Sequence, residues 1–126
     1  MPTPATLEAF VARVESNDHV GAIEDWYAED ATMQENGAVP RAGRATLVAN
    51  ERRVLARARA VRSTCVRPVL VNDDVVVIRW IFEFDWLDGS RTRMEELAWQ
   101  RWRGERIAEE RFFYDPAQLV PRRPEA

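Results

Sequence analysis

Apolar residues recur at helical spacing in three stretches of the first half of the chain. In residues 6–15 they are Leu7, Phe10, Val11 and Val14. In a second stretch, with Asp18 as the expected N-cap and an expected end near Glu29, they are Val20, Ile23, Trp26 and Tyr27. Residues 44–59 carry a third stripe, made of Leu47, Asn50, Glu51, Val54, Leu55 and Ala58. Residues three and four apart share one face of a helix, so three helices are predicted.

The second half of the chain changes to apolar runs rich in β-branched and aromatic residues, separated by turn signals. The predicted strands cover residues 61–71, 75–86, 92–102 and 106–114. The turns between them are Asn72-Asp73-Asp74, Asp88-Gly89 and Gly104. A further short strand is predicted at residues 31–34, before a loop at 35–43. Helices followed by a four-stranded antiparallel meander predict an α+β domain with the helices on one face of the sheet.

The two faces of the predicted sheet differ in polarity. Even positions of the 75–86 strand are Val76, Ile78, Trp80, Phe82, Phe84 and Trp86, so this face must be covered. In the 92–102 strand neither face is uniformly apolar. A curved sheet with a cavity on one side and a dimer contact on the other would satisfy both strands, and we expect a homodimer through the sheet. Alternation does not decide which side holds the cavity, because a bulge would reverse the register.

Size and composition favour one domain over residues 1–126, with 117–126 as an extended or disordered tail. The net charge is −3 and both signs are mixed, so the arginines between residues 52 and 67 are interpreted as a solvated helix face. No partnership with nucleic acid or membrane is expected. The N-terminus lacks the features of a secretion signal, and the single cysteine, Cys65, is expected to be buried and inert. These features favour a cytoplasmic location.

The order of the elements, with the motifs YAEDAT, PRAG and GERIAEERFFYDP and the Asp-Gly hairpin, resembles the NTF2-like superfamily over residues 5–118. The similarity is strongest to its SnoaL-like and ketosteroid-isomerase-like branch. This resemblance implies a cone-shaped α+β fold, in which three N-terminal helices pack on a curved, mostly antiparallel sheet that encloses a pocket. Members include isomerases, cyclases, dehydratases, hydrolases and pocket domains without known chemistry, so the fold leaves the reaction open.

The resemblance also implies a position for a general base. The isomerases keep it just after the short strand, where this chain has Glu35. Their two oxyanion donors are a tyrosine and a protonated aspartic acid, and the matching residues here are Phe10 and Ala98. Loss of one such donor typically costs about 2.7–4 kcal/mol of transition-state stabilisation. An efficient ketosteroid isomerase is therefore not expected. The alternative for Glu35 is an exposed carboxylate in a turn.

Two further side chains are candidates for the site. Glu96 shares a strand face with Ala98, and a pKa raised by burial is expected unless Arg79, Arg101 or Arg111 pairs with it. Tyr27 could donate a hydrogen bond into the pocket or be a core tyrosine bonded to the backbone. The expected pocket lining is Phe10, Met33, Met94, Ala98, Trp102, Arg111 and Phe113. The single histidine, His19, is expected near the surface, which disfavours a mechanism centred on histidine.

No acidic run has the spacing of a calcium loop, and PRAGRA lacks the partners of a phosphate loop, so neither a metal nor a cofactor is expected. The leading hypothesis is a small-molecule pocket protein of SnoaL-like type. If it is an enzyme, it would carry out cofactor-free isomerisation, cyclisation or dehydration of an apolar carbonyl compound, with Glu35, Glu96 and Tyr27 as the catalytic groups. The alternative is a non-catalytic ligand-binding or dimerisation domain, which a pocket well below about 300 Å³ would favour.

Overall fold

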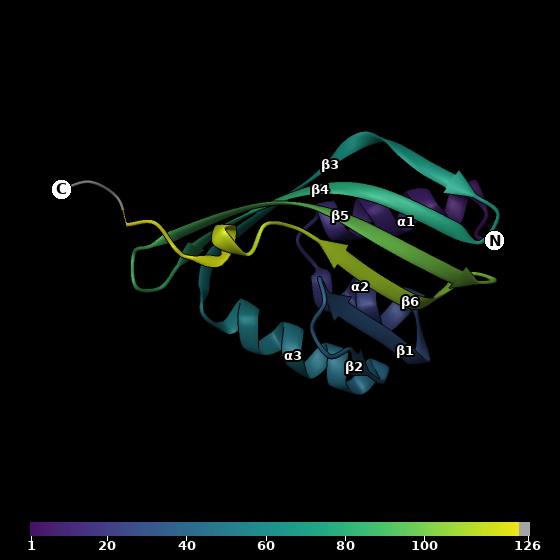
Figure 1. The fold of residues 1–126 in the computed structure, drawn as a ribbon, viewed down its shortest axis with the longest axis horizontal. Coiled ribbons are helices and arrows are strands. Elements are labelled where there is room, and N and C mark those ends of the chain that lie inside the picture. Colours follow the sequence, from purple (N-terminus) through teal and green to yellow (C-terminus); the bar gives the residue numbers. More distant parts are fainter. Residues whose placement is uncertain (124–126) are drawn as a thin grey trace.

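The computed structural model describes residues 1–123 and contains three α-helices, a short 3₁₀ helix and one six-stranded sheet (Figure 1). The helices are α1 (Pro4–Glu15), α2 (His19–Trp26), α3 (Arg44–Ala56) and the 3₁₀ helix η1 (Pro116–Leu119). The strands are β1 (Tyr27–Glu35), β2 (Arg41–Ala42), β3 (Ala58–Asn72), β4 (Val75–Trp86), β5 (Arg91–Arg103) and β6 (Arg106–Phe113). The predicted α+β class is confirmed.

The sheet has the strand order β2-β1-β6-β5-β4-β3. Only the pair β1–β6 is parallel, so the sheet is mostly antiparallel and the meander from β3 to β6 is confirmed. The helices lie together on one side of the curved sheet (Figure 1). The apolar faces of the helices pack on this side of the sheet and form the hydrophobic core with it. Phe10 and Val11 of α1 and Leu47 of α3 are almost fully buried there.

Local chemistry explains where the helices begin. Thr3 caps α1 by accepting a hydrogen bond from the Thr6 backbone N–H at 3.1 Å. Asp18 caps α2 as predicted, accepting from the Gly21 N–H at 2.9 Å. Between the two helices Asn17 has φ of 72°, in the left-handed region that asparagine tolerates better than most residues. The chain therefore turns sharply from α1 into α2.

The predicted end of α2 near Glu29 is wrong, because the helix stops at Trp26. Tyr27 is already extended, with φ of −94° and ψ of 141°, and it pairs with Ile107 of β6. The first strand therefore covers Tyr27–Glu35, well beyond the predicted residues 31–34. Hydrogen bonding to β6, a strand far away in the sequence, overrides the helical spacing of Trp26 and Tyr27.

The register of β4 and β5 decides which face is inward. Phe82 lies opposite Met94 and Trp80 lies opposite Glu96, so even positions of both strands share a face. Every even residue of β5 from Thr92 to Trp102 is buried. The odd face is open, with Leu97 45% exposed and its cross-strand partner Phe113 43% exposed. The inward face is therefore the even one.

A bulge changes the alternation in β6. Trp102 of β5 pairs with Ile107, whereas the preceding Arg101 pairs with Glu109, so β6 has one extra residue here. As a result Ile107 and Glu110, three residues apart, are both buried. The bulge thereby directs Glu110 to the helix-covered side of the sheet.

The C-terminal segment has more structure than the predicted tail. Residues 116–119 form η1, and Arg122 exchanges two backbone hydrogen bonds of 2.7 Å with Arg91 at the start of β5. The last part of the predicted tail, residues 124–126, lies outside the described residues. No helix in the described part of the chain is long and apolar enough to cross a membrane.

Candidate functional site

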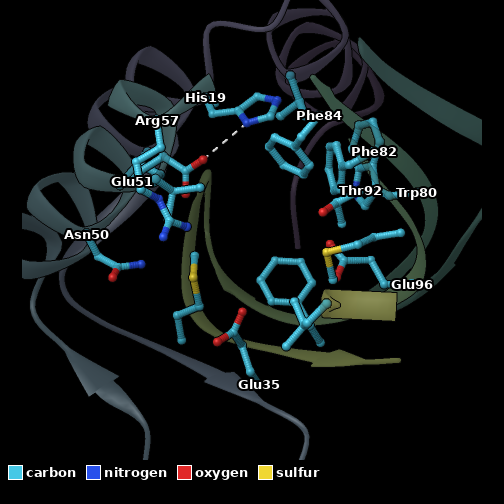
Figure 2. Close-up of a pocket in the computed structure, with 18 of the residues that line it drawn as sticks. His19, Glu35, Asn50, Glu51, Arg57, Trp80, Phe82, Phe84, Thr92 and Glu96 are labelled. Carbon is cyan, nitrogen blue, oxygen red and sulfur yellow. Dashed lines mark hydrogen bonds and ion pairs between the residues drawn. The ribbon is translucent and has the colours of Figure 1, made fainter. Parts of the chain in front are cut away.

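A cavity of about 800 Å³ lies between the inward face of the sheet and the helices α2 and α3 (Figure 2). This volume falls within the usual range of roughly 300–1,000 Å³ for small-molecule sites. Strands β4 and β5 form one wall, and the ends of β1 and β6 contribute Glu35 and Phe112. Leu119 and Pro121 of the C-terminal segment also line it. The core is therefore not packed shut at this end of the sheet.

A row of four aromatic rings on β4 forms the apolar wall of the cavity. Trp80, Phe82, Phe84 and Trp86 point to the same side because side chains alternate along a strand. Trp80 and Phe82 are stacked, with ring centroids 5.4 Å apart and planes 19° apart. Phe84 and Trp86 are stacked at 4.8 Å and 1°. This wall offers flat apolar contacts to a ligand.

Glu96 projects into the cavity from β5, opposite Trp80 (Figure 2). Its side chain is buried, and no described residue forms a hydrogen bond or ion pair with its carboxyl group. Burial, followed by the negative charges of Glu110, Glu35 and Glu51, raises the pKa of Glu96 to about 8. Glu96 is therefore mainly a neutral carboxylic acid at pH 7.

The alternative of an ion pair at Glu96 is wrong, because each candidate arginine has another partner. Arg79 binds Glu95 on the outer face of the sheet, and Arg101 lies 3.0 Å from Asp74. Arg111 donates a hydrogen bond from Nε to the backbone oxygen of Asn36 at 2.9 Å.

Glu35 ends β1 at the rim of the same cavity and lies opposite Phe112 of β6. Its Oε2 is 3.3 Å from Nη1 of Arg41, and 40% of the Glu35 side chain remains exposed. The predicted alternative, an exposed carboxylate in a turn, is met in part, because the Glu35 carbonyl oxygen accepts a hydrogen bond from the Ala38 N–H at 3.0 Å in the turn after β1. The Glu35 side chain nevertheless lines the cavity (Figure 2). Glu35 and Glu96 thus reach one cavity from two different strands.

Tyr27 belongs to a buried polar chain. Its hydroxyl donates to Oε1 of Glu110, and Nε2 of Gln100 donates to Oε2 of Glu110 at 2.6 Å. Trp102 continues the chain by donating from Nε1 to Oε1 of Gln100 at 2.9 Å. Burial raises the pKa of Glu110 to about 7, although the hydrogen bonds from Gln100 and Tyr27 oppose the rise. Tyr27 also lines the cavity, but its proton is committed to Glu110, which differs from both predicted roles.

His19 is the residue that the sequence interpretation missed. It is 8% exposed and lines the cavity, whereas a surface position was predicted. Its Nε2 lies 2.7 Å from Oγ of Ser63 on β3, and its Nδ1 lies 3.2 Å from Oε1 of Glu51 on α3 (Figure 2). The spacing of four between His19 and Ile23 placed both on the inward stripe of α2, and this signal could have found it.

The predicted pocket residues divide into two groups. Phe10, Met33 and Met94 line the cavity. Ala98 and Trp102 face the same side of β5 but lie deeper, in the packed core. Arg111 and Phe113 point to the outer face because the bulge in β6 puts Glu110 and Phe112 inside; the Arg111 guanidinium lies 4.6 Å over the Phe113 ring.

Metal-ligand chemistry has little geometric support in residues 1–123. No group of three or more histidine, cysteine, aspartate or glutamate side chains there could hold a metal ion. Cys65 is buried on β3, and burial raises the pKa of its thiol.

Known structures share this fold. A protein with a ketosteroid isomerase-like fold from Catenulispora acidiphila, solved with trimethylamine, is 19% identical at a TM-score of 0.77, over 94% of this chain and 91% of that one. A protein from Mesorhizobium loti that is named as a SnoaL-like polyketide cyclase is 22% identical at a TM-score of 0.73, over 87% of this chain and 97% of that one. An LEH-like epoxide hydrolase from M. tuberculosis is 15% identical at 0.74, over 91% and 84%. At such low sequence identities, the similarity establishes a shared fold and does not assign an activity to this chain.

Comparison with curated proteins finds no match. The profile of the SnoaL-like domain, however, matches residues 7–110, which include α1 from Leu7 onwards, α2, α3, β1–β5 and β6 as far as Glu110. The matched range therefore contains the cavity residues Glu35, Glu96 and His19. The chain belongs to the SnoaL-like domain family.

Proposed function

We propose that the protein is a cofactor-free acid–base catalyst that acts on an apolar carbonyl compound bound in the 800 Å³ cavity. The observation that carries this proposal is Glu96, a buried carboxyl group without a cationic partner among the described residues, facing an aromatic wall. Its raised pKa, about 8, keeps a proton available near neutral pH. Catalytic acids are commonly tuned in this way by burial.

Glu35 and Glu96 then have complementary roles. The Glu35 carboxylate removes a proton from the carbon next to the carbonyl group. Glu96 donates a hydrogen bond, and finally its proton, to the carbonyl oxygen as that oxygen becomes negative. In a β,γ-unsaturated carbonyl compound, Glu35 then returns its proton to the γ-carbon while the enol O–H proton goes back to Glu96, which gives isomerisation. Attack of the enol α-carbon on a second carbonyl group gives cyclisation: the new alkoxide oxygen takes the proton held by Glu35, and the enol O–H proton goes back to Glu96. Tyr27 and Gln100 hold Glu110 in place beside the cavity.

Proton abstraction can be measured without knowledge of the natural substrate. We expect the protein to exchange the α-protons of 1-tetralone for deuterium in D₂O, followed by proton NMR. Glu35→Gln should abolish the exchange, because the base is lost. Glu96→Met should slow it by roughly 10²–10³-fold, as removal of one oxyanion donor typically does. Glu24→Gln, an exposed position on α2, is the matched control and should exchange at the wild-type rate.

Two results would contradict this function. Full exchange activity in Glu35→Gln would exclude Glu35 as the base. Saturable binding of 1-tetralone without exchange above the uncatalysed rate would favour the alternative, a domain that binds its ligand unchanged.

A further inference from the structure

A second polar group of residues lies in the cavity wall, away from Glu35 and Glu96. It consists of His19 at the start of α2, Glu51 on α3 and Ser63 on β3. The His19 ring packs edge-on against Phe82, with centroids 5.3 Å apart, so it is fixed between the aromatic wall and the helices. In Figure 2 His19 and Glu51 lie across the cavity from Glu96. The function proposed above uses neither residue.

The hydrogen bonds of this group define where its protons lie. The Ser63 hydroxyl donates its only proton to Oδ1 of Asn17 at 2.9 Å. Nε2 of His19, 2.7 Å from the same hydroxyl oxygen, must therefore be the donor in that contact. Nδ1 can then bond to Oε1 of Glu51, 3.2 Å away, only if one further proton lies between them. The geometry therefore calls for one proton shared by His19 and Glu51.

Both nitrogens of His19 are occupied in this arrangement, so the imidazole has no polar atom left for a ligand. Glu51 is different: its Oε1 faces His19, while the side chain is 21% exposed and lines the cavity. No other described residue bonds to its carboxyl group. Glu51 is thus the group that a bound molecule would contact, and His19 is a positioning residue that orients it.

We propose that Glu51, oriented by His19, binds a hydroxyl group of the ligand at the side of the cavity opposite Glu96. The natural ligand is then an apolar carbonyl compound that carries a hydroxyl group at its other end. This inference rests on the proposed function in placing the carbonyl group at Glu96. A carboxylate accepts a hydrogen bond from a hydroxyl more strongly than a neutral acceptor does. The Glu51 carboxylate repels an anionic group of a ligand. Arg57, whose guanidinium lies 5.2 Å from the centroid of the Trp86 ring, lines the same cavity and would attract such a group.

Matched probes test the hydroxyl preference. The first is 2-acetylnaphthalene, the second adds a hydroxyl group at carbon 6, and the third has a carboxylate there. We expect the hydroxyl probe to bind wild type about tenfold more tightly than the parent compound, by titration calorimetry. Glu51→Gln and His19→Asn should reduce that ratio to about twofold, and Glu24→Gln should keep it. Because both affinities are measured on the same variant, a general loss of folded protein affects both and leaves their ratio unchanged.

The single histidine makes the shared proton directly observable. With ¹⁵N-labelled histidine at pH 6.0, we expect two imidazole N–H signals in wild type, one for each bonded nitrogen. Glu51→Gln should show only one, because the amide of glutamine can itself donate to Nδ1. A wild-type spectrum with one imidazole N–H signal would overturn the positioning role of His19.

The outcomes separate the two proposals. Equal affinity for parent and hydroxyl probes, with active deuterium exchange, would overturn the role of Glu51 alone. Tightest binding of the carboxylate probe would also overturn it, and would assign this end of the cavity to Arg57. Failure of all three probes to bind, together with no exchange, would overturn both proposals.

Discussion

Glu96 and Glu110 are two carboxyl groups that are buried to a similar extent but differ in the hydrogen bonds that they accept. Glu96 and Glu110 are 8% and 3% exposed, and burial is the main cause of the raised pKa of each. Glu110 accepts hydrogen bonds from Tyr27 and Gln100, which favour its charged form, whereas no described residue donates to the Glu96 carboxyl. The negative charge of Glu110 also raises the pKa of Glu96, which reaches about 8, while the pKa of Glu110 is raised to about 7. The unpartnered carboxyl of Glu96 keeps its proton at neutral pH, as the proposed acid requires.

The raised pKa of Glu96 predicts a dependence of stability on pH. Between its ordinary value of 4.5 and about 8, the folded protein holds a proton that the unfolded chain has released. The free energy of unfolding should therefore fall as pH rises through this window, by up to about 1.4 kcal/mol per pH unit. Glu96→Gln cannot titrate, so its stability relative to wild type should rise by about 2 kcal/mol between pH 5.5 and 7.5.

Urea denaturation of both proteins at the two pH values measures this change. Glu110 titrates in both proteins, so the difference between them contains the titration of Glu96 and its coupling to Glu110. Glu95→Gln, on the outer face of the same strand, is the control and should show no such trend. A stability difference between Glu96→Gln and wild type that is the same at pH 5.5 and 7.5 would mean that the Glu96 pKa is not raised.

At the scale of elements, Gly43 fixes the start of α3 and hence the position of Glu51. Gly43 has φ of 93° and ψ of 128°, a conformation that residues with a Cβ rarely adopt, and its N–H bonds to Ala31 of β1 at 2.8 Å. Gly43→Ala should therefore lower the free energy of unfolding by about 1–3 kcal/mol, measured by urea denaturation. Gly37→Ala is the matched control, because a Cβ there meets nothing within 4 Å. Equal effects of the two substitutions would contradict this explanation.

The sequence predicted those elements that local signals define. The bounds of β4 were predicted correctly as residues 75–86, because turn residues stand on both sides of an alternating run. The N-cap at Asp18 was also predicted correctly, because it stands directly before a stripe of apolar residues at helical spacing. The end of α2 and the bulge in β6 were not predictable in this way, since both depend on pairing with strands distant in the sequence.

The candidate site was predicted in part for the same physical reason. Glu96 and Met94 follow the parity of an uninterrupted strand, and both line the cavity. Arg111 and Phe113 lie beyond the bulge, which reverses the parity that would have placed them inside. The partners of Tyr27 and His19 lie on β6, α3 and β3, so their hydrogen bonds emerge only when the whole fold is assembled.

For the whole molecule, the outer face of the sheet predicts self-association. Leu97 and Phe113 form an exposed cross-strand pair, and Ile81 and Trp99 lie half-buried on the same face. We expect a homodimer through this face, since exposed apolar patches commonly mark interfaces. Leu97→Glu should shift the dimer towards monomer in light-scattering measurements. Val39→Glu, 89% exposed on a loop, should not, and a monomeric wild type at micromolar concentration would contradict the prediction.

The parallel pairing of β1 with β6 also bears on the order in which the molecule folds. Strands β3, β4 and β5 are joined by short turns, so their contacts are local and can form early. Strand β1 can pair with β6 only after Glu110, the cross-strand partner of Met33 far along the chain, has been brought close to it. Glu35 is carried on β1, whereas Glu96 is carried on the meander. Folding kinetics should therefore show the meander forming before the two carboxyl groups first face one another.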